Sequence, residues 1–149
     1  MKKYLLLITI ALSLLVVAYT IFIACLYYNE NHINLGILKW ENCGNNESVL
    51  KDIKGKILIG PAGISIWVEY PYVYGKYLLD NDGNYKNFII DLREKNLKAE
   101  MIEKSYFLYE LKNRGLEYHN MVSYWSLTGQ WGDKILLEEF KKQICNRNR

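Results

Sequence analysis

The strongest pattern in the sequence is an apolar run over residues 4–24 that no charged residue interrupts. As a helix, this run would reach about 31 Å, which matches the hydrocarbon thickness of a bilayer. We therefore expect residues 4–24 to contact the lipid bilayer. They form the centre of an N-terminal signal anchor, a single transmembrane helix, over residues 1–28.

Two alternatives to an uncleaved anchor remain open. A cleaved signal sequence has a shorter apolar core, of about 7–15 residues, so the length of the run disfavours it. A bacterial lipoprotein is the second alternative, because Phe22-Ile23-Ala24-Cys25 has an alanine before a cysteine that would be the site of lipidation. A phenylalanine at the first of these positions and the long core both count against the lipoprotein. In all three interpretations, the rest of the chain is exported across the membrane.

The flanking charges predict the orientation of the anchor. Lys2 and Lys3 precede the run, whereas Asn29, Glu30 and Asn31 follow it. By the positive-inside rule, the N-terminus lies in the cytoplasm and the C-terminal domain lies on the other side of the membrane. We expect a single-pass protein of a bacterial inner membrane with a periplasmic domain.

After the anchor, the pattern predicts a polar linker over residues 29–46 and an exported domain over residues 47–149. The apolar segment 33–40 within the linker is either an edge strand or an ordered linker. Residues 64–70 alternate between apolar and polar side chains, which is typical of a strand with one buried face. Asp82-Gly83 lies between two β-rich runs and predicts a hairpin. Residues 56–102 therefore read as an antiparallel meander of four or five strands.

Helical spacing predicts two or three helices packed on this sheet. Residues 47–54 have three apolar residues on one helical face and a glycine just beyond. A second helix is expected over 106–114, and a third over 134–145, where Asp133 is a suitable N-cap and the apolar residues form one stripe. Strands followed by helices indicate the α+β class, with helices on one face of an antiparallel sheet.

The charge of the chain disfavours nucleic acid as a partner. The net charge is +3, and removing the contribution of Lys2 and Lys3 leaves +1 for the rest of the chain. A nucleic-acid-binding domain usually has a basic stripe. We therefore predict no nucleic-acid partner.

The chain has three cysteines, one of them in the anchor. An oxidising compartment would permit a disulfide between Cys43 and Cys145, joining the start of the exported part to its last helix. Two free thiols are the alternative.

Candidate chemistry is sparse. His119 lies near Ser123 and Ser126 in the sequence, and Asp133 follows, but the chain has no Gly-x-Ser-x-Gly motif. The histidines and cysteines have no zinc-ligand spacing. We predict no enzyme, no cofactor and no metal, and keep a hydrolase that uses His119 as the weakest hypothesis.

The aromatic content favours binding instead. Tyrosine and tryptophan are common at protein interfaces because they are apolar and form hydrogen bonds. Trp67, Trp125 and Trp131 are the candidate contact surface, whereas the tyrosines of residues 70–74 are better explained as a buried sheet face. The preferred hypothesis is a non-catalytic envelope protein that binds another protein, with an immunity or exclusion role as one form. The alternative is a lipid-anchored structural or accessory protein that contacts cell-wall glycan.

Overall fold

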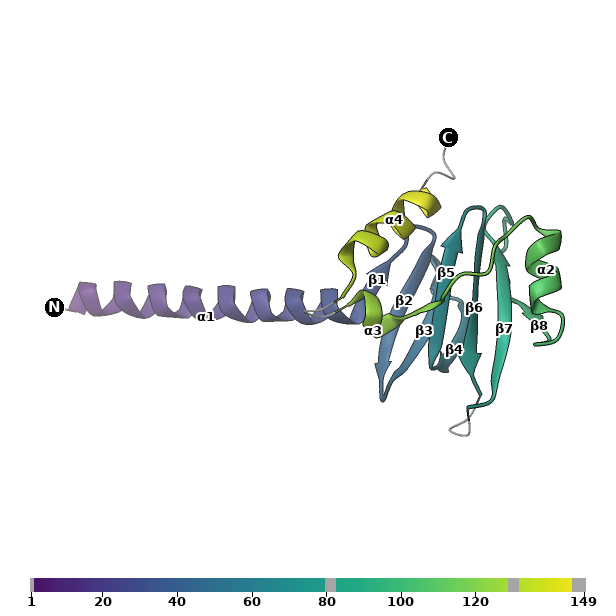
Figure 1. The fold of residues 1–149 in the computed structure, drawn as a ribbon. Helices are drawn as coiled ribbons and strands as arrows, with labels where there is room; N and C mark the ends of the chain where they lie inside the picture. Colours follow the sequence, from purple (N-terminus) through teal and green to yellow (C-terminus); the bar gives the residue numbers. More distant parts are fainter. Residues whose placement is uncertain (1, 80–82, 129–131, 146–149) are drawn as a thin grey trace. The chain divides into compact units, whose positions relative to one another are not determined.

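A computed structural model describes residues 2–79, 83–128 and 132–145 and divides the chain into two units (Figure 1). The first unit is the helix α1, Lys2–Asn31. Within the described residues, its segment Thr9–Tyr28 is the one stretch that is both long and apolar enough to cross a membrane. The predicted N-terminal helix of membrane length is confirmed. A membrane anchor and a signal sequence share this property.

The second unit begins at His32 and contains two antiparallel sheets. The first sheet has the order β1-β2-β3-β4, and the second has the order β8-β7-β6-β5-β9. The strands of the first sheet are β1 His32–Asn34, β2 Leu38–Gly44, β3 Glu47–Asp52 and β4 Ile57–Ala62. Those of the second are β5 Ile64–Glu69, β6 Tyr72–Leu78, β7 Tyr85–Asp91, β8 Glu100–Ile102 and β9 Val122–Ser123.

Three helices accompany the sheets, namely α2 Phe107–Asn113, α3 Tyr124–Leu127 and α4 Lys134–Cys145. Helix α2 lies beside β7 and β8, whereas α3 and α4 lie on the other side of the domain, near β1 and β5 (Figure 1). The predicted α+β class is confirmed. Four strands of the expected meander are present as β5 to β8, whereas residues 57–62, expected to be its first strand, form β4 and pair with β3 of the other sheet. The helices expected at residues 106–114 and 134–145 correspond to α2 and α4.

Two predictions about residues 29–54 are wrong. The expected polar linker over 29–46 contains β1 and β2, and the expected helix over 47–54 is the strand β3. Trp40 pairs with Leu50 across the first sheet, and both side chains are fully buried. A helix of two turns has little stability of its own, so the pairing and burial decide the conformation.

The main core lies between the two sheets. Its largest fully buried side chains include Trp40 from β2 and Phe88 from β7, both without exposed surface. The Trp40 Nε1–H donates a hydrogen bond to Ser48 Oγ over 2.8 Å, so the buried indole and the buried hydroxyl satisfy each other. A second cluster on the opposite face of the five-stranded sheet packs Tyr74 and Ile89 under α2.

Helices α3 and α4 cover the gap between β1 and β5, which we call the covered gap. Phe140 and Ile144 of α4 belong to the main core. Gly36, in the turn between β1 and β2, has a φ of +79°, and an added Cβ would lie 3.4 Å from Ile144 Cγ2. This turn therefore needs glycine for its backbone conformation, whereas an added Cβ would make only an ordinary contact with α4.

Candidate functional site

On the opposite side of the domain from the covered gap, a cavity of about 390 Å³ lies along β4. Its lining comes from β4, from the end of β6 with the following residue, and from Met101 on β8. We call this cavity the apolar groove, and its lining residues are Ile57, Leu58, Ile59, Gly60, Pro61, Ala62, Tyr77, Leu78, Leu79 and Met101. None of these ten residues is charged.

The rim of the apolar groove consists of large apolar side chains that are about half exposed. The exposed fractions are 52% for Ile57, 45% for Leu78, 50% for Leu79 and 48% for Met101. Ile59 in its floor is buried and belongs to the main core. This group of half-exposed apolar side chains is the candidate interaction surface of the domain.

A smaller cavity of about 270 Å³ lies at the start of β4, where Lys56 in its lining directly precedes Ile57 of the groove. It is lined by Ile37, Asp52, Ile53, Lys54, Lys56, Lys95, Asn96 and Leu97. Asp52 Oδ1 accepts hydrogen bonds from the backbone N–H groups of Lys54 and Lys56, at 2.8 Å and 2.9 Å. Within the described chain, none of the three lysines forms an ion pair. We call Lys54, Lys56 and Lys95 the lysine end of the groove.

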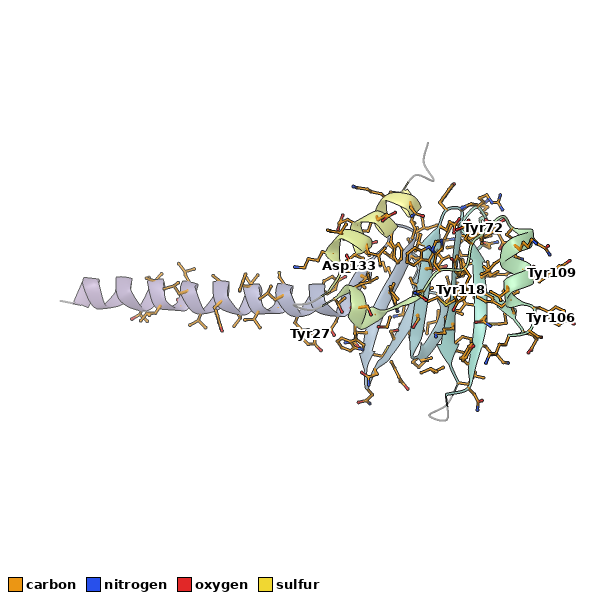
Figure 2. The ribbon with its side chains drawn as sticks, viewed as in Figure 1. Tyr27, Tyr72, Tyr106, Tyr109, Tyr118 and Asp133 are labelled. Atoms are coloured by element: carbon orange, nitrogen blue, oxygen red, sulfur yellow. The ribbon has the colours of Figure 1, made fainter. Side chains whose placement is uncertain are left out.

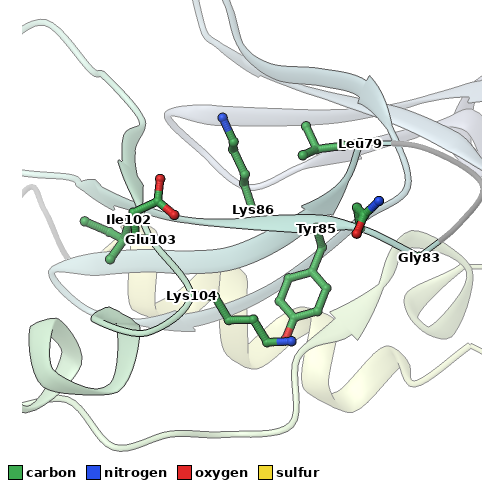
Figure 3. A pocket seen from close by; sticks show the side chains of 8 residues that line it. Leu79, Gly83, Tyr85, Lys86, Ile102, Glu103 and Lys104 are labelled. Carbon is green, nitrogen blue, oxygen red and sulfur yellow. The ribbon is translucent and has the colours of Figure 1, made fainter.

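Two other cavities, each of about 380 Å³, have charged residues in their linings. One surrounds Tyr85, whose ring centroid lies 4.7 Å from Lys104 Nζ, and Figure 3 shows Lys104 running alongside this ring. Tyr72 lines the other, between two guanidinium groups. Arg93 donates hydrogen bonds to Tyr72 Oη and to both oxygens of Asp91, and hydrogen bonding to Arg93 lowers the pKa of Asp91.

The structure gives His119 a packing role on the edge of β5. Its ring stacks on Trp67, with 4.6 Å between centroids and 16° between planes. Its Nε2 lies 3.6 Å from Glu69 Oε2, which is an ion-pair distance when the histidine is protonated. Trp67 also makes an edge contact with Phe140 of α4, at 5.3 Å. His119 therefore extends the aromatic packing that holds α4 against β5.

The residues of the hydrolase hypothesis do not form a triad among the described residues. Ser123 Oγ lies 2.9 Å from Ser126 Oγ, so these hydroxyls bond to each other. Asp133 Oδ1 accepts a hydrogen bond from the backbone N–H of Leu136 at 2.9 Å, which is the predicted N-cap of α4. Each group has a local structural partner, and none of them reaches His119 by a hydrogen bond.

The three tryptophans predicted as a contact surface lie in different situations. Trp67 is half-buried under His119 and Phe140, so it is unavailable as an exposed platform. Trp125 on α3 is half exposed, with its ring edge-on to Tyr124 at 5.7 Å. Trp131 lies outside the described residues. The most exposed aromatics of the domain include Tyr106 and Tyr109, which point away from the sheets (Figure 2).

The predicted disulfide is absent, and the fold explains why. Cys25, Cys43 and Cys145 are free and exposed. Cys145 Sγ lies 3.5 Å from the position that a Cβ on Gly36 would take, at one end of β2. Cys43 lies at the other end, and the strand from Leu38 to Cys43 spans about 16 Å. A disulfide requires Cα atoms within about 7 Å, so this pairing is wrong for the observed fold.

Comparison with known proteins gives no family for this chain. No family model, no curated protein and no solved structure matches it.

The apolar groove is the feature that the sequence analysis missed. Its residues come from segments up to 44 positions apart, from Ile57 to Met101, and each segment alone reads as an ordinary strand. The available signal was Leu78-Leu79 at a strand end next to a turn, where two consecutive large apolar residues have no obvious cover.

Proposed function

We propose that this chain is a membrane-anchored, non-catalytic protein that binds another protein through the apolar groove. The observation that carries this proposal is the set of ten uncharged lining residues, four of them large and about half exposed. The polar clusters elsewhere support a non-catalytic role, because His119, Ser123 and Asp133 each contact a structural partner. An immunity or exclusion role is one form of this function.

The anchor restricts where the partner is met. We propose that α1 crosses a bacterial inner membrane, with Lys2 and Lys3 in the cytoplasm and the domain in the periplasm. Helix α1 ends at Asn31 and β1 begins at His32, so an anchored α1 tethers the domain to the membrane. The partner is therefore either a membrane protein or a protein that reaches the membrane surface.

The intact mass of the protein extracted from membranes tests the anchor. A chain that begins at Met1 is the expected result. A chain that begins at an acylated Cys25 would replace the transmembrane anchor with a lipid anchor, and a chain shortened without acylation would identify a cleaved signal sequence.

Site-specific photocrosslinking in native membranes tests the function. The full-length chain would carry a photoreactive phenylalanine at Ile57 or Met101, which are both half exposed in the groove. Tyr109, 61% exposed on α2, is the matched control position. We expect the same partner protein to be crosslinked from both groove positions and not from position 109.

A blocking variant makes this test specific. Leu79→Asp places a charge in the apolar lining without removing a buried side chain, since Leu79 is half exposed. It should abolish the crosslinks from positions 57 and 101 while leaving the circular dichroism spectrum unchanged. Equal crosslinking from position 109, or groove crosslinks that survive Leu79→Asp, would contradict the proposal.

A further inference from the structure

We infer that the apolar groove accepts an extended, acidic segment of the partner, which pairs with the free edge of β4 and places carboxylates at the lysine end. This inference rests on the proposed function and specifies the chemistry of the partner. Three features of the described residues carry it: the position of β4 in its sheet, the course of the groove and the distribution of charge.

Strand β4 is the last strand of its sheet, and among the described strands it pairs only with β3. Its other edge is therefore available to an additional strand. All six residues of β4, from Ile57 to Ala62, line the groove, so the groove follows this edge along its whole length. An extended segment bound there would gain main-chain hydrogen bonds, and its alternate side chains would enter the apolar lining.

Proline determines which half of this edge is suitable for pairing. Pro61 has no N–H group and cannot donate to an added strand. Each residue of the first half of β4, Ile57–Ile59, has a backbone N–H group, and those that do not face β3 can donate to an added strand. This half lies next to Lys56. The part of β4 that can pair with an added strand is therefore also the part beside the lysine end.

The charges at this end specify the sign of the partner. Three lysines and one carboxylate line the basic cavity, and Asp52 already accepts two backbone hydrogen bonds. Lys56 Nζ has only a long contact of 3.5 Å with the backbone oxygen of Leu97. Unpaired ammonium groups beside an apolar surface favour a ligand with carboxylates next to apolar side chains.

The same features disfavour two other occupants. A bilayer is flat, whereas this apolar surface is a concave cavity that fits side chains. A second copy that paired through its own β4 would bring Ile57–Ala62, which contains no carboxylate for the lysine end. The experiments below can detect binding of either a bilayer or a second copy.

The test measures peptide binding to the full-length chain in nanodiscs of uncharged lipid by fluorescence anisotropy. The probes are two labelled peptides with the same apolar half, Glu-Glu-Val-Thr-Val-Thr-Val and Lys-Lys-Val-Thr-Val-Thr-Val. We expect the acidic peptide to bind at least about tenfold tighter than the basic one, and the difference to shrink at high salt. An acidic peptide with N-methylated valines, which cannot donate hydrogen bonds, should bind at least about tenfold more weakly.

Charge variants of the protein locate the effect. Lys54→Gln with Lys56→Gln should remove most of the preference for the acidic peptide. The matched control, Lys112→Gln with Lys142→Gln, removes the same charge from exposed helix positions and should leave the preference unchanged. Equal binding of the two peptides, no binding, or full binding of the N-methylated peptide would overturn the inference.

Failure of the inference is distinguishable from failure of the proposed function. Groove-specific crosslinking together with failure of the peptides would retain protein binding and reject the acidic strand. Sedimentation with phosphatidylglycerol vesicles that is abolished by Leu79→Asp, or dimerisation abolished by the same variant, would overturn the inference in favour of lipid or a second copy.

Discussion

The two gaps between the sheets differ in one respect: one is covered and the other is open. Helices α3 and α4 cover the gap between β1 and β5, and Phe140 in it has no exposed surface. No described helix covers the apolar groove between β4 and β8, where Ile57 and Met101 are half exposed. The domain therefore uses one gap to complete its core and leaves comparable apolar surface open in the other.

The open groove does not result from a shortage of covering elements. Helix α2 covers the outer face of the five-stranded sheet, where Phe107 and Leu111 pack on Tyr74 and Ile89. Among the described residues, each of the two buried clusters thus has a cover, either a second sheet or a helix. This difference directs the search for a partner to the groove, and four predictions test it.

The largest expected difference is between Phe140→Ala in the covered gap and Met101→Ala in the groove. Phe140 is fully buried and contacts Trp67, so its truncation should lower the free energy of unfolding by about 3–5 kcal/mol. Met101 is half exposed, and its truncation should cost less than about 1 kcal/mol. Urea unfolding of the full-length protein in detergent measures both. Similar losses for the two variants would mean that the groove is as structural as the covered gap.

The next effect concerns alkaline pH and Tyr124 in the covered gap. Burial, with a further contribution from the charge of Glu41, raises the pKa of Tyr124 above its usual value. The folded state therefore disfavours the tyrosinate. The stabilising effect is complete below pH 10, near the pKa of an unfolded tyrosine, and is lost as the pH rises above it.

Tyr124→Phe isolates this contribution. Above pH 10, the stability of the wild type should fall faster than that of Tyr124→Phe, by up to about 1.4 kcal/mol per pH unit. Unfolding curves at pH 8, 10 and 11 measure the two slopes. Parallel slopes would indicate that the Tyr124 hydroxyl ionises as easily in the folded domain as in the unfolded chain.

Local sequence patterns were sufficient to predict those helices and strands whose contacts are between residues near in the sequence. The alternation in residues 64–70 and the Asp-Gly turn predicted the meander, and the apolar stripe with the Asp133 cap predicted α4. The apolar run predicted the one membrane-length helix. In each case a single period, or a single capping residue, carries the information.

The first sheet and the groove could not be predicted in this way, because pairing between segments defines them. In the first sheet, Trp40 pairs with Leu50, and Leu50 pairs with Ile59. The sequence of each of these three segments, taken alone, does not decide its secondary structure. The groove requires the end of β6 and Met101 of β8 to lie near β4. The half-buried position of Trp67 could not be predicted for the same reason, because His119 and Phe140 reach it only through the tertiary fold.

A smaller effect is expected from His119, at the margin of the covered gap. His119→Ala removes the stack on Trp67 and should lower the free energy of unfolding by about 1 kcal/mol. His119→Phe keeps an aromatic ring there and should recover most of this loss. Loss of a cellular activity without any loss of stability in His119→Ala would revive the hydrolase hypothesis, whereas a stability loss that phenylalanine restores assigns His119 to packing.

The smallest effect on stability, and the most informative one, is expected in the groove. Leu79→Gln with Met101→Gln replaces two half-exposed apolar side chains by polar ones of similar size. Because neither side chain belongs to a buried cluster, the free energy of unfolding should change by less than about 0.5 kcal/mol per site. Crosslinking of the partner from position 57 should nevertheless be lost, since the apolar contact surface is interrupted. A large loss of stability would instead mean that these residues complete the core, and the distinction between the covered gap and the open groove would fail.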